Sequence, residues 1–213
     1  MTPTDRGSNY DKQMDTAREI FRTYDIEKIA AKFSLETDAR YMHITYMNTP
    51  YLIEKATGTI LEPSCSPCRS FNTVLTIYDM LCHNEDDVLP ALSGSWVPVE
   101  SFSVTGKAPD PGVFSQKYAD RFSGHIKALR SACVSLGGEI LPPIAGADIS
   151  ARIPAFTFFP VILQFWEGDD EFAPKVKILW DARTMSFLRF ETTYYLQGDL
   201  LGRLCGSLCT NAE

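Results

Sequence analysis

The sequence lacks the patterns that place a protein in a membrane or direct it out of the cell. Its N-terminus has no charged segment followed by an apolar core, so we expect no signal peptide. The longest apolar run, Ile153 to Trp166, is too short for a transmembrane helix and contains two prolines. These absences predict a soluble cytoplasmic protein with no membrane partner.

The chain also has too little positive charge for nucleic acid to be its main partner. Its 20 lysines and arginines are scattered along the sequence and are outnumbered by 27 acidic residues, which gives a net charge of −7. Proteins that bind DNA or RNA gather basic side chains on one face, where they displace counterions from the phosphates. We therefore expect no nucleic-acid partner.

No known catalytic motif is present. The sequence has neither a glycine-rich phosphate loop nor a G-x-S-x-G segment, which argues against P-loop, kinase and hydrolase classes. Only three histidines occur, His43, His83 and His125, and none has a neighbour at metal-ligand spacing. The sequence therefore identifies no catalytic residue and directly supports no cofactor.

The chain does contain enough apolar residues for a sizeable core. Of its 213 residues, 45% are hydrophobic and 12% are aromatic. No long polar or low-complexity tract divides the sequence in two. This predicts a single domain over residues 1–213, with residues 1–8 as a flexible N-terminal tail.

Five segments have apolar residues at helical spacing: 10–24, 26–33, 71–82, 114–136 and 190–209. Asp25 and Ser70 precede two of these segments and are suitable N-caps. The segment 114–136 has the clearest stripe and ends at Gly137, so it predicts one unbroken helix. In the last segment Gly198, Gly202 and Gly206 align, which predicts that another backbone packs closely there.

Between the helical segments, other stretches have the composition of β-strands. Residues 41–47, 51–54 and 59–61 predict an antiparallel meander, and 176–180 alternates like a strand. Residues 156–166 predict either a strand pair or one bent strand broken near Pro160. The predicted fold class is α+β, with an antiparallel sheet flanked by amphipathic helices.

An acidic turn between two apolar segments is the most distinctive local feature. Asp169, Asp170 and Glu171 lie between Trp166 and Phe172. These carboxylates could bind a hard cation or a ligand, or act as acid and base, because neighbouring carboxylates raise one another's pKa. Alternatively, one carboxylate caps the turn by accepting backbone N–H groups, which is the commoner role of such residues.

Two residues elsewhere could complete a site around this turn. Glu191 stands at the start of the last helical segment, where the helix dipole alone explains an acidic residue. Trp96 is a second aromatic candidate. The candidate ligand-binding set is thus Trp96, Trp166, Asp169, Asp170, Glu171, Phe172 and Glu191.

The cysteines give a rival hypothesis. Cys65 and Cys68 form a C-x-x-C pair, while Cys205 and Cys209 are spaced by four residues in a helical segment. Together they could form a four-thiolate zinc or iron–sulfur site. An isolated C-x-x-C pair is weak evidence, and free thiols are the alternative that we favour.

In their order along the chain, several segments resemble an uncharacterised microbial family called domain of unknown function 3786. The matching segments are 25–33, 46–60, 73–78, 93–102, 163–172, 178–181, 187–188 and Glu191. The most specific match is the Trp-x-x-Asp-Asp-Glu-Phe pattern of the acidic turn. The resemblance implies no established activity, but it implies a context in corrinoid, iron–sulfur or one-carbon metabolism. The chain lacks the C-x-x-C-x-x-C run of the iron–sulfur domains fused to some members.

Three functional hypotheses follow. The first is a binding or accessory domain that recognises a small molecule or a protein near Trp166 to Phe172. The second is an enzyme that uses the carboxylate cluster, with or without a divalent cation. The third is a thiolate metal-site protein. We prefer the first, because no motif in the sequence specifies a reaction.

Overall fold

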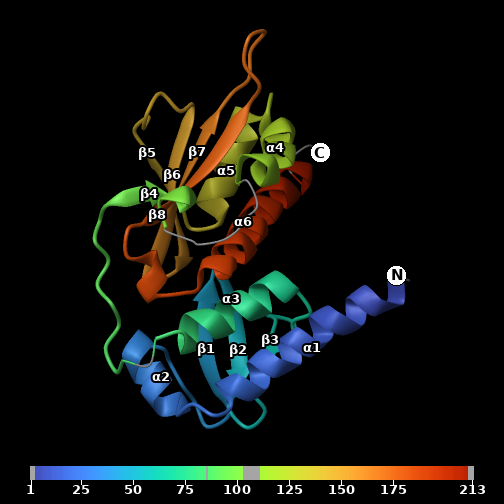
Figure 1. Ribbon diagram of the computed structural model, residues 1–213, viewed down its shortest axis with the longest axis vertical. Coiled ribbons are helices and arrows are strands. Elements are labelled where there is room, and N and C mark those ends of the chain that lie inside the picture. The colour runs from blue at the N-terminus through green and yellow to red at the C-terminus, as the bar shows by residue number, and fades with distance from the viewer. Residues whose placement is uncertain (1–2, 85, 103–110, 211–213) are drawn as a thin grey trace.

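A computed structural model describes residues 3–84, 86–102 and 111–210 of the chain (Figure 1). Within these ranges six α-helices surround an antiparallel sheet of eight strands, which confirms the predicted α+β class. No helix in the described ranges combines the length and the apolar character needed to cross a membrane. Residues 3–8, predicted as part of a flexible tail, form the first turns of a helix.

The N-terminal half, residues 3–84, contains three helices and three strands. These are α1 (Pro3–Phe21), α2 (Ile26–Phe33), β1 (Tyr41–Tyr46), β2 (Thr49–Glu54), β3 (Ile60–Leu61) and α3 (Phe71–Cys82). Both predicted N-caps are confirmed. The Asp25 carboxylate accepts from two backbone N–H groups of α2, and the Ser70 hydroxyl accepts from the Thr73 N–H of α3. Met47 and Asn48 make a tight turn between β1 and β2 with positive φ at both positions.

The C-terminal half, residues 86–210, contributes the longer strands and the longest helix. Its elements are β4 (Trp96–Pro98), α4 (Pro111–Phe122), α5 (Ile126–Ser135), β5 (Glu139–Leu141), β6 (Ile149–Phe156), β7 (Phe159–Trp166), β8 (Lys175–Asp181) and α6 (Phe190–Thr210). Strands β6 and β7 are joined by a turn at residues 157–158. The prediction of a strand pair is therefore correct, although the break lies before Pro160 and β6 begins seven residues earlier than expected.

One continuous sheet runs through both halves in the order β3-β2-β1-β6-β7-β8-β4. Strand β5 lies outside this order and pairs with the first half of β6. The junction between the halves is narrow, because β1 and β6 pair only at Tyr46 and Phe156. The rings of these two residues are buried and lie 5.0 Å apart. Helix α3 packs on α6 above this junction (Figure 1).

The predicted helix over 114–136 is wrong in one respect, because it is two helices. Helix α4 ends at Phe122 and α5 begins at Ile126, and Gly124 between them has φ +77°. The Glu167 carboxylate, at the end of β7, accepts from the Ser123 hydroxyl and from the Gly124 N–H at 3.1 Å. A partner more than 40 residues away thus stabilises a break that the apolar stripe does not reveal.

The expectation for the aligned glycines of α6 is also wrong. A Cβ built at Gly198 would lie 3.1 Å from the Asn72 side chain, so this position is crowded. At Gly202 and Gly206 a Cβ would meet nothing within 4 Å. The three glycines therefore do not line a close contact between backbones.

Candidate functional site

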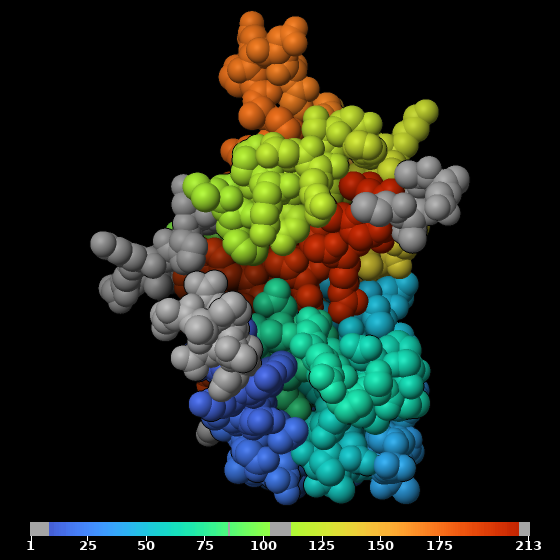
Figure 2. All heavy atoms as spheres, turned by 90° about the vertical axis from the view of Figure 1, so that its right-hand side faces the viewer, coloured from blue at the N-terminus to red at the C-terminus, as the bar shows by residue number. Residues whose placement is uncertain are grey.

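The acidic turn lies at the tip of the β7–β8 hairpin, which projects from the C-terminal half (Figures 1 and 2). As predicted, it joins two neighbouring strands, and Trp166 pairs with Lys175 at its base. The Asp169 carboxylate accepts from the N–H groups of Glu171 and Phe172 at 2.9 and 2.7 Å. The Asp169 N–H in turn donates to the Phe172 carbonyl at 2.9 Å. These contacts give Asp169 a role in holding the turn.

The other members of the acidic turn face water. Asp170 and Glu171 are exposed, and Phe172 is 70% exposed. Trp166 is half-buried and donates from its Nε1 to the Ala145 carbonyl at 3.2 Å. The carboxylates therefore do not converge on one point within the described contacts, and the two aromatic side chains differ in exposure.

Trp96 and Glu191 lie away from the acidic turn. Trp96 pairs with Asp181, at the end of β8 opposite the hairpin tip. Since β8 has seven residues at about 3.3 Å each, roughly 20 Å separates its two ends. Glu191 is in the first turn of α6, beyond that far end of β8. The structure thus distributes the predicted ligand-binding set over separate places.

The four predicted thiolates are also spread over different environments. Cys65 is exposed in a turn with φ 60°, whereas Cys205 is buried in α6. Burial raises the pKa of the half-buried Cys68 thiol to about 11. The Cys209 side chain lies outside the described residues. Among the described residues, no group of three or more histidine, cysteine, aspartate or glutamate side chains is placed to hold a metal ion.

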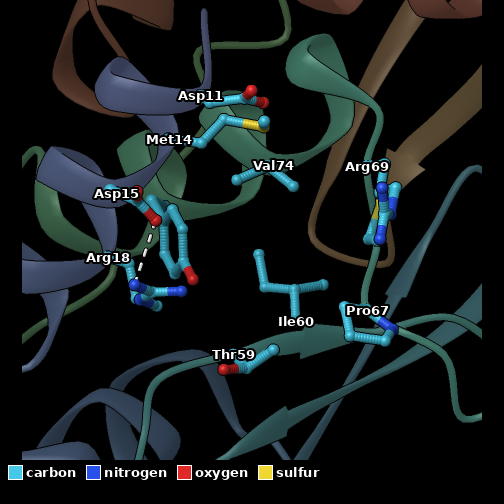
Figure 3. Close-up of a pocket in the computed structure, with 11 residues that line it drawn as sticks. Asp11, Met14, Asp15, Arg18, Thr59, Ile60, Pro67, Arg69 and Val74 are labelled. Carbon is cyan, nitrogen blue, oxygen red and sulfur yellow. Dashed lines mark ion pairs between the residues drawn. The ribbon is translucent and has the colours of Figure 1, made fainter. Parts of the chain in front are cut away.

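A cavity of about 400 Å³ opens in the N-terminal half between α1, β3 and α3 (Figure 3). We call it the α1–β3 cavity. It is lined by Asp11, Met14, Asp15, Arg18, Thr59, Ile60, Pro67, Cys68, Arg69, Val74 and Tyr78. None of these residues except Cys68 belonged to a site predicted from the sequence.

The floor of the α1–β3 cavity is apolar and fixed by the core. Ile60, Val74 and Tyr78 are at most 5% exposed, and all three belong to the main hydrophobic cluster. The Tyr78 hydroxyl donates to the Gly58 carbonyl at 2.6 Å, and burial raises the pKa of this phenol. A ligand would therefore lie against a floor that is already ordered and already largely buried.

Charged side chains stand on two walls of this cavity. On the α1 wall, Arg18 pairs with Asp15 at 3.0 Å, and Asp11 lies one turn closer to the N-terminus of the helix. On the facing wall, Arg69 has no ion-pair partner within the described part of the chain. The Asp15 and Arg18 charges offset each other, which leaves a negative Asp11 and a positive Arg69 on different walls (Figure 3).

A cluster of polar side chains lies between α3, α6 and the β1–β2 hairpin, and we call it the α3–α6 polar cluster. Asp199 accepts from the Thr73 hydroxyl at 2.6 Å, and Arg203 donates to the Tyr51 hydroxyl at 2.8 Å. Burial raises the pKa of Asp199, although Thr73 and Arg203 oppose this shift. The Arg203 guanidinium also lies 5.1 Å from the ring centre of Tyr46. This cluster joins the two halves.

No pattern in the sequence predicts the α1–β3 cavity. Its charged residues come from a helix, Asp11 to Arg18, and from a loop around Arg69 that lies some 50 residues later. Neither segment contains a motif, and charged residues on a helix ordinarily indicate only a solvated face. The pairing of the two walls depends on how α1 packs against α3.

Comparison with known proteins identifies the family without assigning an activity. No curated protein and no solved structure matches the chain. The family model described as "Domain of unknown function (DUF3786)" matches residues 25–203, which covers most of the chain. The match includes the hairpin with its acidic turn, most of α6 and Arg69, but it leaves out α1. The chain therefore belongs to this family of uncharacterised domains.

Proposed function

We propose that this protein is a binding domain that holds a small zwitterionic molecule in the α1–β3 cavity. The observation that carries the proposal is the position of Arg69, a guanidinium without an ion-pair partner among the described residues, on the wall of an apolar-floored cavity. An arginine of this kind binds a carboxylate or phosphate through paired N–H donors.

The opposite wall carries a carboxylate, which favours a ligand that also has a positive charge. Asp11 has no ion-pair partner in the described ranges, and it lies on α1 (Figure 3). A molecule with an anionic group at one end and an ammonium group at the other would pair with Arg69 and Asp11 at once. Its apolar body would lie against the ordered floor formed by Ile60 and Val74. This combination describes an ω-amino acid, in which an aliphatic chain separates the carboxylate from the ammonium group.

The state of Cys68 supports binding rather than covalent chemistry at this cavity. Its pKa is raised to about 11, chiefly by burial. A cysteine acts as a nucleophile through its thiolate, and a pKa this high leaves the thiol protonated at neutral pH. We therefore assign Cys68 to the wall of the cavity and give it no role in a reaction.

The size of the cavity bears on the metabolic context that the family resemblance implies. A volume of about 400 Å³ lies at the small end of the range for ligand pockets. It suits a compact molecule better than a corrinoid macrocycle. A role in corrinoid, iron–sulfur or one-carbon metabolism would therefore involve a small substrate or effector at this site.

Isothermal titration calorimetry with 5-aminopentanoate, 6-aminohexanoate and 8-aminooctanoate tests the proposal. Each amino acid is compared with its N-acetyl and its carboxamide form, which lack one of the two charges. We expect the free amino acids to bind and each blocked form to bind at least about tenfold more weakly, because a charged group loses its partner.

Two variants locate the binding. Arg69→Ala should abolish the preference for the free carboxylate, and Asp11→Asn should abolish the preference for the free ammonium group. Arg130→Ala, at an exposed arginine on α5, is the matched control and should leave binding unchanged. Equal binding by the wild type and Arg69→Ala, or by the free and blocked ligands, would refute the proposal.

A further inference from the structure

A second cavity lies on the other side of α1, where α1 and α3 meet the start of α6. It has a volume of about 260 Å³ and we call it the α1–α6 cavity. Its walls include Ile20 of α1, Leu75 of α3 and Tyr195 of α6. Ile20 is 48% exposed, which is unusual for a large aliphatic side chain that lines a cavity. The site therefore has apolar surface that a ligand could cover.

A carboxylate with an unused oxygen lines the same cavity. The Asp79 side chain is only 8% exposed. Its Oδ2 accepts from the Arg189 N–H at 2.8 Å and from the Thr192 hydroxyl at 2.6 Å, and these contacts hold the start of α6. Its Oδ1 accepts no hydrogen bond in the described structure. Leaving a buried carboxylate oxygen without a donor is costly, so a donor from outside the chain would be stabilised here.

The ion pair between Arg189 and Asp79 Oδ1 is weak. The Arg189 Nε lies 3.6 Å from Oδ1, which is too long for a good hydrogen bond, and its side chain is 66% exposed. An exposed arginine at this distance contributes little and can swing into water. A cationic ligand could therefore take its place beside Oδ1.

The remaining titratable groups of the cavity favour a cation. Glu191 is an exposed carboxylate at the first turn of α6 and lines the cavity. Cys82 has its pKa raised by burial to about 12, so it is neutral at pH 7. The pKa values of the phenols Tyr78 and Tyr195 are also raised by burial, and they too are neutral. Two carboxylates thus face one displaceable guanidinium.

We propose that the α1–α6 cavity is a second ligand site, which takes an ammonium group on a small apolar body. The ammonium group donates to Asp79 Oδ1 and is attracted by Glu191, while the apolar body covers Ile20 and Leu75. This site requires no anionic group on the ligand, in contrast to the α1–β3 cavity with its Arg69. The proposal therefore does not depend on the function proposed for that cavity.

The test uses 2-phenylethylamine as the probe, with 2-phenylethanol and 3-phenylpropionate as neutral and anionic counterparts of the same shape. Binding is measured by calorimetry and by NMR shifts of the side chains around α1 and α6. We expect the amine to bind, the alcohol to bind at least about tenfold more weakly, and the acid not to bind.

Substitutions at exposed positions avoid the risk of unfolding that accompanies a change at Asp79. Ile20→Trp fills the cavity and should weaken amine binding about tenfold or more, because the occupied space is no longer open. Val134→Trp is the matched control, since Val134 is 54% exposed on α5 and lies far along the chain from the cavity. It should leave amine binding unchanged.

Arg189→Ala removes the guanidinium but keeps the backbone N–H that bonds to Asp79. We expect it to tighten amine binding about fivefold, since a competing exposed cation is lost. Asp170→Asn removes one negative charge on the exposed hairpin tip, outside both cavities, and should have no effect on the amine. Equal amine affinity in Ile20→Trp and Val134→Trp, weaker binding in Arg189→Ala, or loss of binding in Asp170→Asn would overturn the proposal.

Discussion

The two halves of the molecule contain similar elements but bury them to different degrees. In the N-terminal half, β1 and β2 alternate between buried and less buried residues, as strands with one covered face do. In the C-terminal half, six of the eight residues of β7 are buried, as are six of the eight in β6. The C-terminal half therefore builds the more continuous core.

The two cavities for which we propose ligands lie in or next to the N-terminal half. The α1–β3 cavity is formed wholly by that half, and the α1–α6 cavity adds Arg189 and the first residues of α6 to it. Helix α1 supplies a wall to both, although the family match begins at residue 25, beyond this helix. A further cavity of about 250 Å³ lies in the C-terminal half, where residues of β8, α4 and α6 line it, so the halves differ more in the continuity of their cores than in the presence of cavities.

The largest expected effect concerns the cores of the two halves. Phe165 on β7 and Phe21 on α1 are both fully buried, and each contacts another aromatic ring. Phe165→Ala should lower the free energy of global unfolding by about 3–5 kcal/mol. Phe21→Ala should lower it less, because α1 can detach while the rest of the fold persists.

Urea denaturation measures the global change in each variant, and hydrogen exchange of α1 and α3 amides measures local opening. Phe21→Ala should increase exchange in α1 far more than in β7. An equal loss of global stability in both variants would mean that α1 belongs to the same cooperative unit as the C-terminal half.

The second prediction concerns a carboxylate that organises the end of β8. Asp181 is fully buried and accepts from the N–H groups of Ser93, Gly94 and Arg183 and from the Ser93 hydroxyl. Burial alone would raise its pKa, but these hydrogen bonds lower it below the ordinary value. Asp181→Ala should therefore cost about 3 kcal/mol at neutral pH, since several donors lose their acceptor.

The sign of the pH dependence follows from the lowered pKa. The stabilisation by Asp181 is fully present above the unfolded pKa and is lost as the pH falls through the folded value. The difference in unfolding free energy between the wild type and Asp181→Ala should thus shrink in acid. A difference that stays constant down to strongly acidic pH would contradict this account.

A third prediction tests the junction between the halves. The pKa of Asp199 in the α3–α6 polar cluster is raised, chiefly by burial, so its ionised form is disfavoured in the folded state. Such a group contributes stability below its unfolded pKa, and this contribution is lost as the pH rises through the folded pKa. The melting temperature of the wild type relative to Asp199→Asn should therefore fall by a few degrees between about pH 4 and pH 7.

Thermal melts over this pH range measure the effect. Asp170→Asn, on the exposed hairpin tip, is the control for removing one negative charge. If instead the melting temperature of the wild type rises relative to that of Asp199→Asn as the pH rises, Arg203 outweighs burial in setting the pKa of Asp199.

The smallest expected effect lies in the acidic turn. Asp169→Ala removes the acceptor for two backbone N–H groups and should cost about 1 kcal/mol. Asp170→Ala and Phe172→Ala remove exposed side chains and should change the unfolding free energy by less than about 0.5 kcal/mol. Chemical denaturation of the three variants measures these changes. A larger loss for Asp169→Ala than for the other two would confirm that Asp169 stabilises the turn, and equal losses would show that it does not.

Much of the fold was predictable because its signals are local. Ser70 and the apolar spacing after it predicted α3 with its observed bounds, and Asp25 predicted α2. The break between α4 and α5 was not predictable in this way, because Gly124 sits inside an apolar stripe and its partner Glu167 comes from another strand. The candidate site was missed for the same reason, since the α1–β3 cavity assembles segments that have no motif of their own.

The fold class, most helix ends, the hairpin with the acidic turn and the family are specified by local features of the amino-acid sequence. These depend on periodicity, capping and turn chemistry, which act between residues a few positions apart. The arrangement of distant segments was decided by the tertiary structure, which places Glu191 away from that turn and Arg69 opposite a helix from the start of the chain. These relations depend on packing between segments far apart in the sequence, and the energy of packing is shared among contacts that no local pattern records.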